Sequence, residues 1–113
     1  MKPRRDAKVL VNGVLAGILS EYTEGENKRV SFKYDEDYLA YGSPIGSRFP
    51  LILAPFYWDE LPPFFENLAS EGWLRKTQCE QSGVDMDDTF GLLLANGKEL
   101  IGALSITPHK QSE

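Results

Sequence analysis

The fold is decided by residues 8–19, KVLVNGVLAGIL, in which an Asn12-Gly13 pair separates two apolar runs. Asn-Gly between apolar runs is the strongest short-range signal for a β-hairpin, because both residues tolerate the positive φ angles of a two-residue turn. Gly17 lies inside the second run and predicts a bend or bulge in that strand. The stretch therefore predicts two antiparallel strands with one irregularity.

A third strand follows this hairpin. After a polar turn at residues 24–27, Val30, Phe32 and Tyr34 alternate with polar residues. A period of two is typical of a strand with one buried face. The sequence thus predicts a three-strand meander over residues 7–35.

Helical spacing replaces this alternation in the second half of the chain. Residues 36–60 have prolines and glycines spread among aromatics, which indicates an ordered loop with a short strand at 51–54. Pro62 and Pro63 then suit the first turn of a helix, and apolar residues follow at helical spacing. The expected elements are a helix near 61–71, with an extension to 81 left open, a helix near 87–95, a strand over 100–106 and a polar tail at 107–113.

These elements predict an α+β fold: a curved, mostly antiparallel sheet or a small, partly closed barrel with two or three helices. A length of 113 residues suits a single domain, residues 1–113, with its core at about 8–106. No apolar stretch reaches the ~20 residues of a membrane span, and we expect a cytoplasmic protein without a signal peptide.

Charge and residue types exclude several function classes. The net charge of −5 argues against non-specific binding to nucleic acids or to anionic membranes. The lone Cys79 cannot form an internal disulfide or a zinc cluster. Capping explains the aspartates before residue 90, and the remaining candidates lack partners, so we expect no catalytic residue, metal or cofactor. The weak candidates are Asp35, Glu36, Asp37, Cys79, Asp85, Asp87, Asp88 and His109.

Two other function classes stay open at this point. One is a small enzyme that uses Cys79 or the aspartates. The other is a single-stranded nucleic-acid-binding or other non-catalytic interaction module that uses the aromatic residues on a barrel face. The missing catalytic partners disfavour the first class, and the acidic charge disfavours the nucleic-acid binder.

Trp73 is the large apolar residue that the pattern does not place. It follows Leu68 by five residues, which on one continuous helix puts it about 140° away from Leu68, near the opposite face. If Gly72 instead kinks the chain, Trp73 can fold into the core. The pattern leaves both placements open, and an exposed tryptophan would be a typical interface anchor.

Several segments together resemble the N-terminal subdomain of HipA-type toxin kinases. The resemblance covers about residues 8–106, and each segment keeps its order and spacing. It rests on the hairpin at 9–19, the strand and following residues at 30–39, FFENLASEG at 64–72, FGLL at 90–93, Gly97, and IGAL at 101–104.

In that family the kinase core follows this subdomain in the same chain, whereas here the sequence stops soon after Ile106. We therefore expect a free-standing subdomain, similar to the HipS-type antitoxins of split HipBST toxin–antitoxin systems. The resemblance implies a protein without enzymatic activity that neutralises a HipT-like Ser/Thr kinase toxin by binding near its active site. It also implies a HipB-like helix-turn-helix protein as a further partner in a larger complex.

The resemblance also suggests a partner-binding site. Because the subdomain packs against the kinase core in the related chains, the equivalent surface here is expected to face the partner. We expect Trp73 to be the principal contact, supported by Glu71, Gly72 and Phe65. The Glu71-Gly72 break directly before the indole favours its presentation outward.

Overall fold

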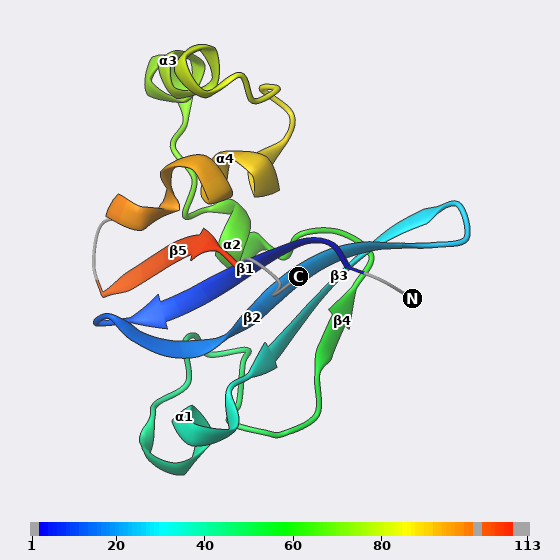
Figure 1. Cartoon of the computed structure of the whole chain (residues 1–113), viewed down its shortest axis with the longest axis vertical. Coiled ribbons are helices and arrows are strands. Elements are labelled where there is room, and N and C mark those ends of the chain that lie inside the picture. Colours follow the sequence, from blue (N-terminus) through cyan, green and yellow to red (C-terminus); the bar gives the residue numbers. More distant parts are fainter. Residues whose placement is uncertain (1–2, 101–102, 110–113) are drawn as a thin grey trace.

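A five-stranded antiparallel sheet with the strand order β4-β3-β2-β1-β5 underlies the fold (Figure 1). The computed structural model describes residues 3–100 and 103–109. The sheet ends in two edge strands, so it is open and does not close into a barrel. Its strands are β1 (Pro3–Val11), β2 (Val14–Glu24), β3 (Asn27–Tyr34), β4 (Phe56–Trp58) and β5 (Leu104–Pro108).

The predicted hairpin joins β1 to β2. Asn12 and Gly13 form its turn with φ angles of 50° and 81°. The register skips Ala16 on β2, which makes the predicted bulge beside Gly17. A Cβ at Gly17 would lie only 2.5 Å from the carbonyl oxygen of Lys33 on β3. Glycine is therefore required where β2 and β3 approach closely.

Four α-helices accompany the sheet in the described part of the chain, whereas two or three were predicted. In Figure 1, α4 lies beside β5 and α3 lies beyond α4, whereas α1 is on the opposite side of the sheet. None of these helices is long and apolar enough to cross a membrane. Their bounds are α1 (Glu36–Tyr41), α2 (Pro63–Glu66), α3 (Gly72–Ser82) and α4 (Thr89–Asn96), followed by the 3-10 turn η1 (Gly97–Glu99).

The core is rich in aromatic rings. Phe32 of β3 is fully buried, and its ring lies 4.9 Å from that of Tyr34 and 5.9 Å from that of Phe65. The Tyr34 hydroxyl donates to the carbonyl of Phe49 and accepts from the backbone N–H of Ile45. Burial raises the pKa of Tyr34, because desolvation disfavours the phenolate. These contacts order the loop before β4.

The segment 36–60 differs from the predicted loop in two ways. Residues 36–41 form α1, whose N-cap Asp35 accepts a hydrogen bond from the backbone N–H of Asp37. The strand predicted at 51–54 is wrong, because the strand is β4 at Phe56–Trp58. Prolines at positions 50 and 55 flank the predicted strand and cannot donate the backbone hydrogen bonds of a ladder.

The helix predicted over 61–71 is also wrong in its length. Helix α2 ends at Glu66, and α3 begins as a separate helix at Gly72, whose φ of 62° is left-handed. The ends of the last predicted elements shift slightly as well. Helix α4 spans 89–96, and β5 extends to Pro108, two residues into the expected polar tail. Positions 101–102 of the predicted last strand and 110–113 of the tail lie outside the described residues.

Candidate partner-binding site

The first turn of α3 carries an exposed aromatic side chain. Trp73 is 77% exposed and Leu74 is 45% exposed. The preceding residue Gly72 is left-handed, and Glu71 has an extended backbone and no side-chain cap bond. The chain thus turns sharply into α3 and leaves the indole in solvent. Of the two placements that the sequence left open, the structure has the exposed one.

Helix α3 is fastened to the rest of the domain by Arg75. Its guanidinium donates to the carbonyl oxygen of Met86 at 2.9 and 2.7 Å and to the Thr89 hydroxyl at 2.8 Å. That hydroxyl donates in turn to the Glu66 carboxylate at 2.8 Å. The chain of bonds joins α2, α3 and the start of α4, so it holds the helix that carries Trp73.

The C-terminal half of α3 is anchored by packing. Cys79 is buried, and its sulfur lies 3.9 Å from the carbonyl oxygen of Asp85. Gly83 ends the helix in the left-handed conformation, with its N–H donating to the Cys79 carbonyl. A buried thiol in this position acts as a small apolar core residue.

An ion cluster pins α4 to the sheet. Arg5 of β1 donates to the Glu21 carboxylate at 2.9 and 2.7 Å and to the Asp88 carboxylate at 2.8 and 2.9 Å. Its guanidinium also lies 5.0 Å from the centre of the Phe90 ring. Asp88 caps α4 by accepting the N–H of Gly91. Its carboxylate is thus occupied by structural contacts.

These contacts shift two pKa values in opposite directions. The hydrogen bond from Arg5 is the main reason why the pKa of Asp88 is lowered, and the Gly91 N–H adds to it. The hydrogen bond to Asp88 likewise raises the pKa of Arg5, against the effect of burial. Both shifts favour the charged pair.

A groove of about 420 Å³ lies beside α3 and is lined there by Leu74 and Gln78. Leu68, Leu74 and Leu93 are among the residues that line it. The sequence analysis did not single out Leu74 or the exposed Met86. The adjacent apolar pair Trp73-Leu74 was the available signal, because a short helix on the edge of a small domain does not bury two consecutive side chains.

The structure brings three of the four predicted site residues together on the surface. Glu71, Gly72 and Trp73 are consecutive and exposed. Phe65 is completely buried, and its ring packs against Phe32 and others in the core. A direct contact of Phe65 with a partner is therefore excluded in this fold, and its contribution is to support the core under α2.

The remaining titratable candidates do not converge. Within the described ranges, 3–100 and 103–109, no three His, Cys, Asp or Glu side chains are grouped so that they could hold a metal ion. Asp35, Asp85 and Asp88 each accept hydrogen bonds from nearby backbone N–H groups. Asp88 is the N-cap of α4, as the sequence predicts, and Asp35 is the N-cap of α1, which the sequence analysis did not predict. Asp85 accepts the N–H of Asp87 in the turn before α4 and does not cap the helix.

Comparison with known proteins finds one relative of similar length and two relatives that are much longer than this chain. An uncharacterised protein of Haemophilus influenzae is 36% identical over 95% of this chain and 95% of its own length. Two putative kinases of Sinorhizobium fredii, Y4dM and Y4mE, are 31% and 29% identical over 80% and 83% of this chain. The matched regions cover only 24% and 23% of those kinases.

A solved structure and a family sequence model also match this chain. A solved structure described as the N-terminal domain of HipA toxin superposes with a TM-score of 0.73 and 31% identity, covering 99% of both chains. The sequence model of the HipA N-terminal domain matches residues 7–107. The chain therefore belongs to the HipA N-terminal domain family.

Proposed function

We propose that this protein is a HipS-like antitoxin that binds a HipT-like Ser/Thr kinase toxin and inhibits it. The domain is similar to about a quarter of each of two longer putative kinases, and a relative of nearly the same length is known. In this proposal the domain has no kinase core of its own, and it binds a kinase that a separate gene encodes. A HipB-like helix-turn-helix protein is the expected third member of the complex.

The observation that carries the proposal is Trp73, 77% exposed on a helix that Arg75 holds in place. A tryptophan side chain buries about 150–250 Å² when it is covered. A preorganised aromatic anchor also loses little conformational freedom on binding. Trp73 therefore has the properties of an interface hot spot.

Inhibition follows if the indole enters the kinase near its nucleotide cleft. Phosphoryl transfer depends on the positioning of the nucleotide, the metal ions and the nucleophile. A rigid ring wedged between the lobes would keep the cleft from closing on ATP. In this proposal, Glu71 and Gly72 at the start of α3, both exposed, contact the same partner.

The first test is the genomic neighbourhood of the gene. We expect an adjacent gene for a kinase that lacks this N-terminal domain, and a gene with no kinase nearby would contradict the proposal. The second test is binding of that kinase to purified Trp73→Ala protein. We expect an affinity about 30 to 1,000 times lower than wild type, which corresponds to a hot-spot loss of about 2–4 kcal/mol.

The matched control is Tyr57→Ala, because Tyr57 is an exposed aromatic on β4, at 57% exposure. We expect this variant to bind and inhibit the kinase like wild type. The melting temperatures of both variants should stay close to that of wild type, which shows that both proteins are folded. A folded Trp73→Ala protein that still protects cells from the kinase would refute the proposed role of Trp73.

A further inference from the structure

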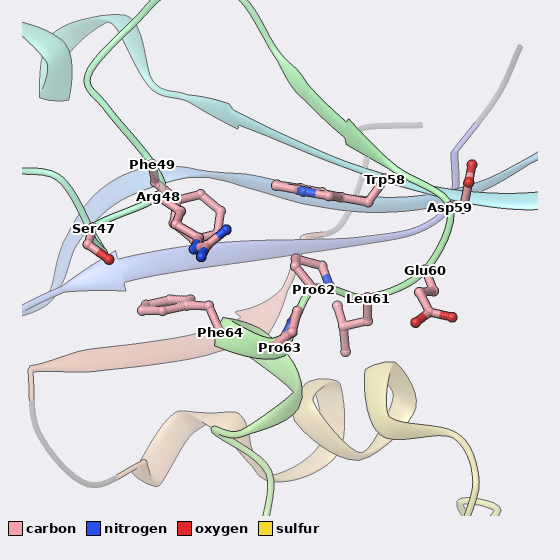
Figure 2. Close-up of a pocket in the computed structure, with 10 residues that line it drawn as sticks. All are labelled: Ser47, Arg48, Phe49, Trp58, Asp59, Glu60, Leu61, Pro62, Pro63 and Phe64. Carbon is pink, nitrogen blue, oxygen red and sulfur yellow. The ribbon is translucent and has the colours of Figure 1, made fainter.

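A second surface, separate from Trp73, is formed by the loop before β4, by β4 itself and by the segment that leads into α2. Figure 2 shows the groove between these elements, with aromatic rings on both sides. Its volume of about 660 Å³ lies within the range of ordinary ligand-binding pockets. No side chain of the described residues fills this volume, and the volume is large enough to accept side chains of another molecule.

The aromatic walls of this groove are held by the core. The Trp58 ring stacks on Phe56, with an angle of 4° between planes and 6.0 Å between centroids. Phe49, which is almost completely buried, packs against both Trp58 and Phe64, at 5.6 and 5.1 Å. The rings are therefore positioned before any ligand arrives, which reduces the entropic cost of binding.

The two ends of the groove differ in charge. Arg48 lies at one end, whereas Asp59 and Glu60 lie at the other (Figure 2). The Asp59 side chain is 90% exposed, and it has one ion-pair contact at 3.5 Å, to Arg29. Glu60 is exposed and makes no ion pair within the described part of the chain. The acidic end can therefore receive a cation without losing a buried interaction.

The backbone at the groove favours an extended ligand. β4 is one of the two edge strands of the sheet, and it pairs on one side only, with β3 through positions 30–32. Pro62 and Pro63 form part of the opposite wall. Aromatic-lined grooves bind polyproline-type segments, whose own backbone is already ordered.

We propose that this groove binds an extended peptide segment of a partner protein, with a proline or leucine against the rings of Trp58 and Phe64 and a lysine or arginine against Asp59 and Glu60. The apolar residue matches the aromatic walls, and the basic residue matches the acidic end. This surface uses none of the residues assigned to kinase inhibition. It therefore goes beyond the proposed function and does not depend on it.

The test begins with selection of a displayed library of short random peptides against the intact protein. We expect enriched sequences in which proline or leucine lies beside lysine or arginine. The best peptide is then synthesised and titrated by calorimetry into wild type and into the double variant Asp59→Asn/Glu60→Gln. Removing both charges should weaken binding about tenfold, because each exposed ion pair contributes modestly.

The matched control is the double variant Glu26→Gln/Glu80→Gln, which removes two exposed acidic charges outside the groove. It should bind the peptide like wild type, and so should Trp73→Ala. Three results would overturn the proposal: no enrichment, equal binding by the Asp59→Asn/Glu60→Gln variant, or a self-associated protein in which a second copy fills the groove. Loss of kinase binding by Trp73→Ala without loss of peptide binding separates the two surfaces.

Discussion

At the scale of single residues, Phe65 and Trp73 lie on either side of the same break between helices and meet opposite environments. Phe65 is fully buried, with its ring 5.6 Å from that of Phe49, whereas Trp73 is 77% exposed. Burial of a large aromatic side chain stabilises the folded state, and exposure of one leaves it free for a partner. We therefore expect Phe65 to contribute to the stability of the fold and Trp73 to contribute to the binding of a partner.

We expect Phe65→Ala to lower the free energy of unfolding by about 3–5 kcal/mol, because truncation of a buried phenylalanine loses apolar contacts and leaves a cavity. Urea denaturation followed by circular dichroism measures this loss. Trp73→Ala is the control, with an expected change within about 0.5 kcal/mol, as for most surface substitutions. Equal destabilisation by the two variants would show that Trp73 belongs to the core in solution.

Gly72 allows the chain to turn between α2 and α3, because glycine adopts a left-handed backbone conformation without strain. We expect Gly72→Ala to destabilise the protein by about 1 kcal/mol, because an L-alanine at a φ of 62° is strained even though its Cβ would meet nothing within 4 Å. The matched control is Glu71→Ala, since the Glu71 side chain makes no cap bond. Thermal melting of the two variants distinguishes backbone strain from loss of a side chain, and a neutral Gly72→Ala would rule out the strain.

At the scale of elements, α3 depends on polar contacts more than on apolar burial. Cys79 is its one buried residue, and Arg75 supplies the bonds to Met86 and Thr89. A helix with so little buried apolar surface opens locally at low cost unless such bonds hold it. The orientation of Trp73 thus depends on the hydrogen bonds of Arg75 on the same helix.

We expect Arg75→Gln to increase amide hydrogen exchange in α3 selectively, while the sheet keeps its protection. The variant removes the hydrogen bonds from Arg75 to the Met86 carbonyl and the Thr89 hydroxyl, and one such bond contributes about 1 kcal/mol net. The control is Lys76→Gln, an exposed neighbour on the same helix. Unchanged exchange in α3 of the Arg75→Gln protein would mean that packing alone holds the helix.

At the scale of the whole molecule, the cluster of Arg5, Glu21 and Asp88 joins the first strand to the last helix. Arg5 and Asp88 are separated by 83 positions in sequence, yet their side chains form two hydrogen bonds. Glu21 is buried and satisfied by the same guanidinium. The cluster thus ties the helical side of the fold to the sheet.

We expect this contact to make stability fall as the pH drops below about 4. The pKa of Asp88 in the folded state lies below its usual 3.8, so its stabilising effect is complete above that value and is lost as pH falls through the folded-state pKa. Asp88→Asn keeps a capping side chain but loses the charge. The variant should be less stable by about 1 kcal/mol at pH 7, since water partly screens the pair.

Urea denaturation of both proteins at pH 7 and at pH 2 checks this expectation. The difference between wild type and Asp88→Asn should narrow as the pH falls through the folded-state pKa of Asp88, because protonation removes the charge that the variant lacks. A difference that stays constant across this range would show that the charge of Asp88 does not contribute. Asp87→Asn serves as a control, because the Asp87 side chain is exposed near the same cluster.

The sequence by itself determined the features that follow from backbone rules over a few residues. Asn12-Gly13 requires a tight turn, the alternation at residues 30–34 requires a half-buried strand, and Gly17 marks a bulge. Such features depend on allowed φ angles and on side-chain periodicity, which neighbouring residues set. The α+β class and the family resemblance follow from the same local patterns in their order along the chain.

Only the tertiary structure decided the placement of segments whose local signals were ambiguous. The break at 67–71 arises where α2 ends in the core and α3 is fastened by Arg75, and β4 lies where Trp58 pairs with Val30. The exposure of Trp73, the burial of Phe65 and the pairing of Arg5 with Asp88 likewise depend on distant partners. Local propensities differ by less than such long-range contacts contribute, so packing selects among the conformations that the sequence allows.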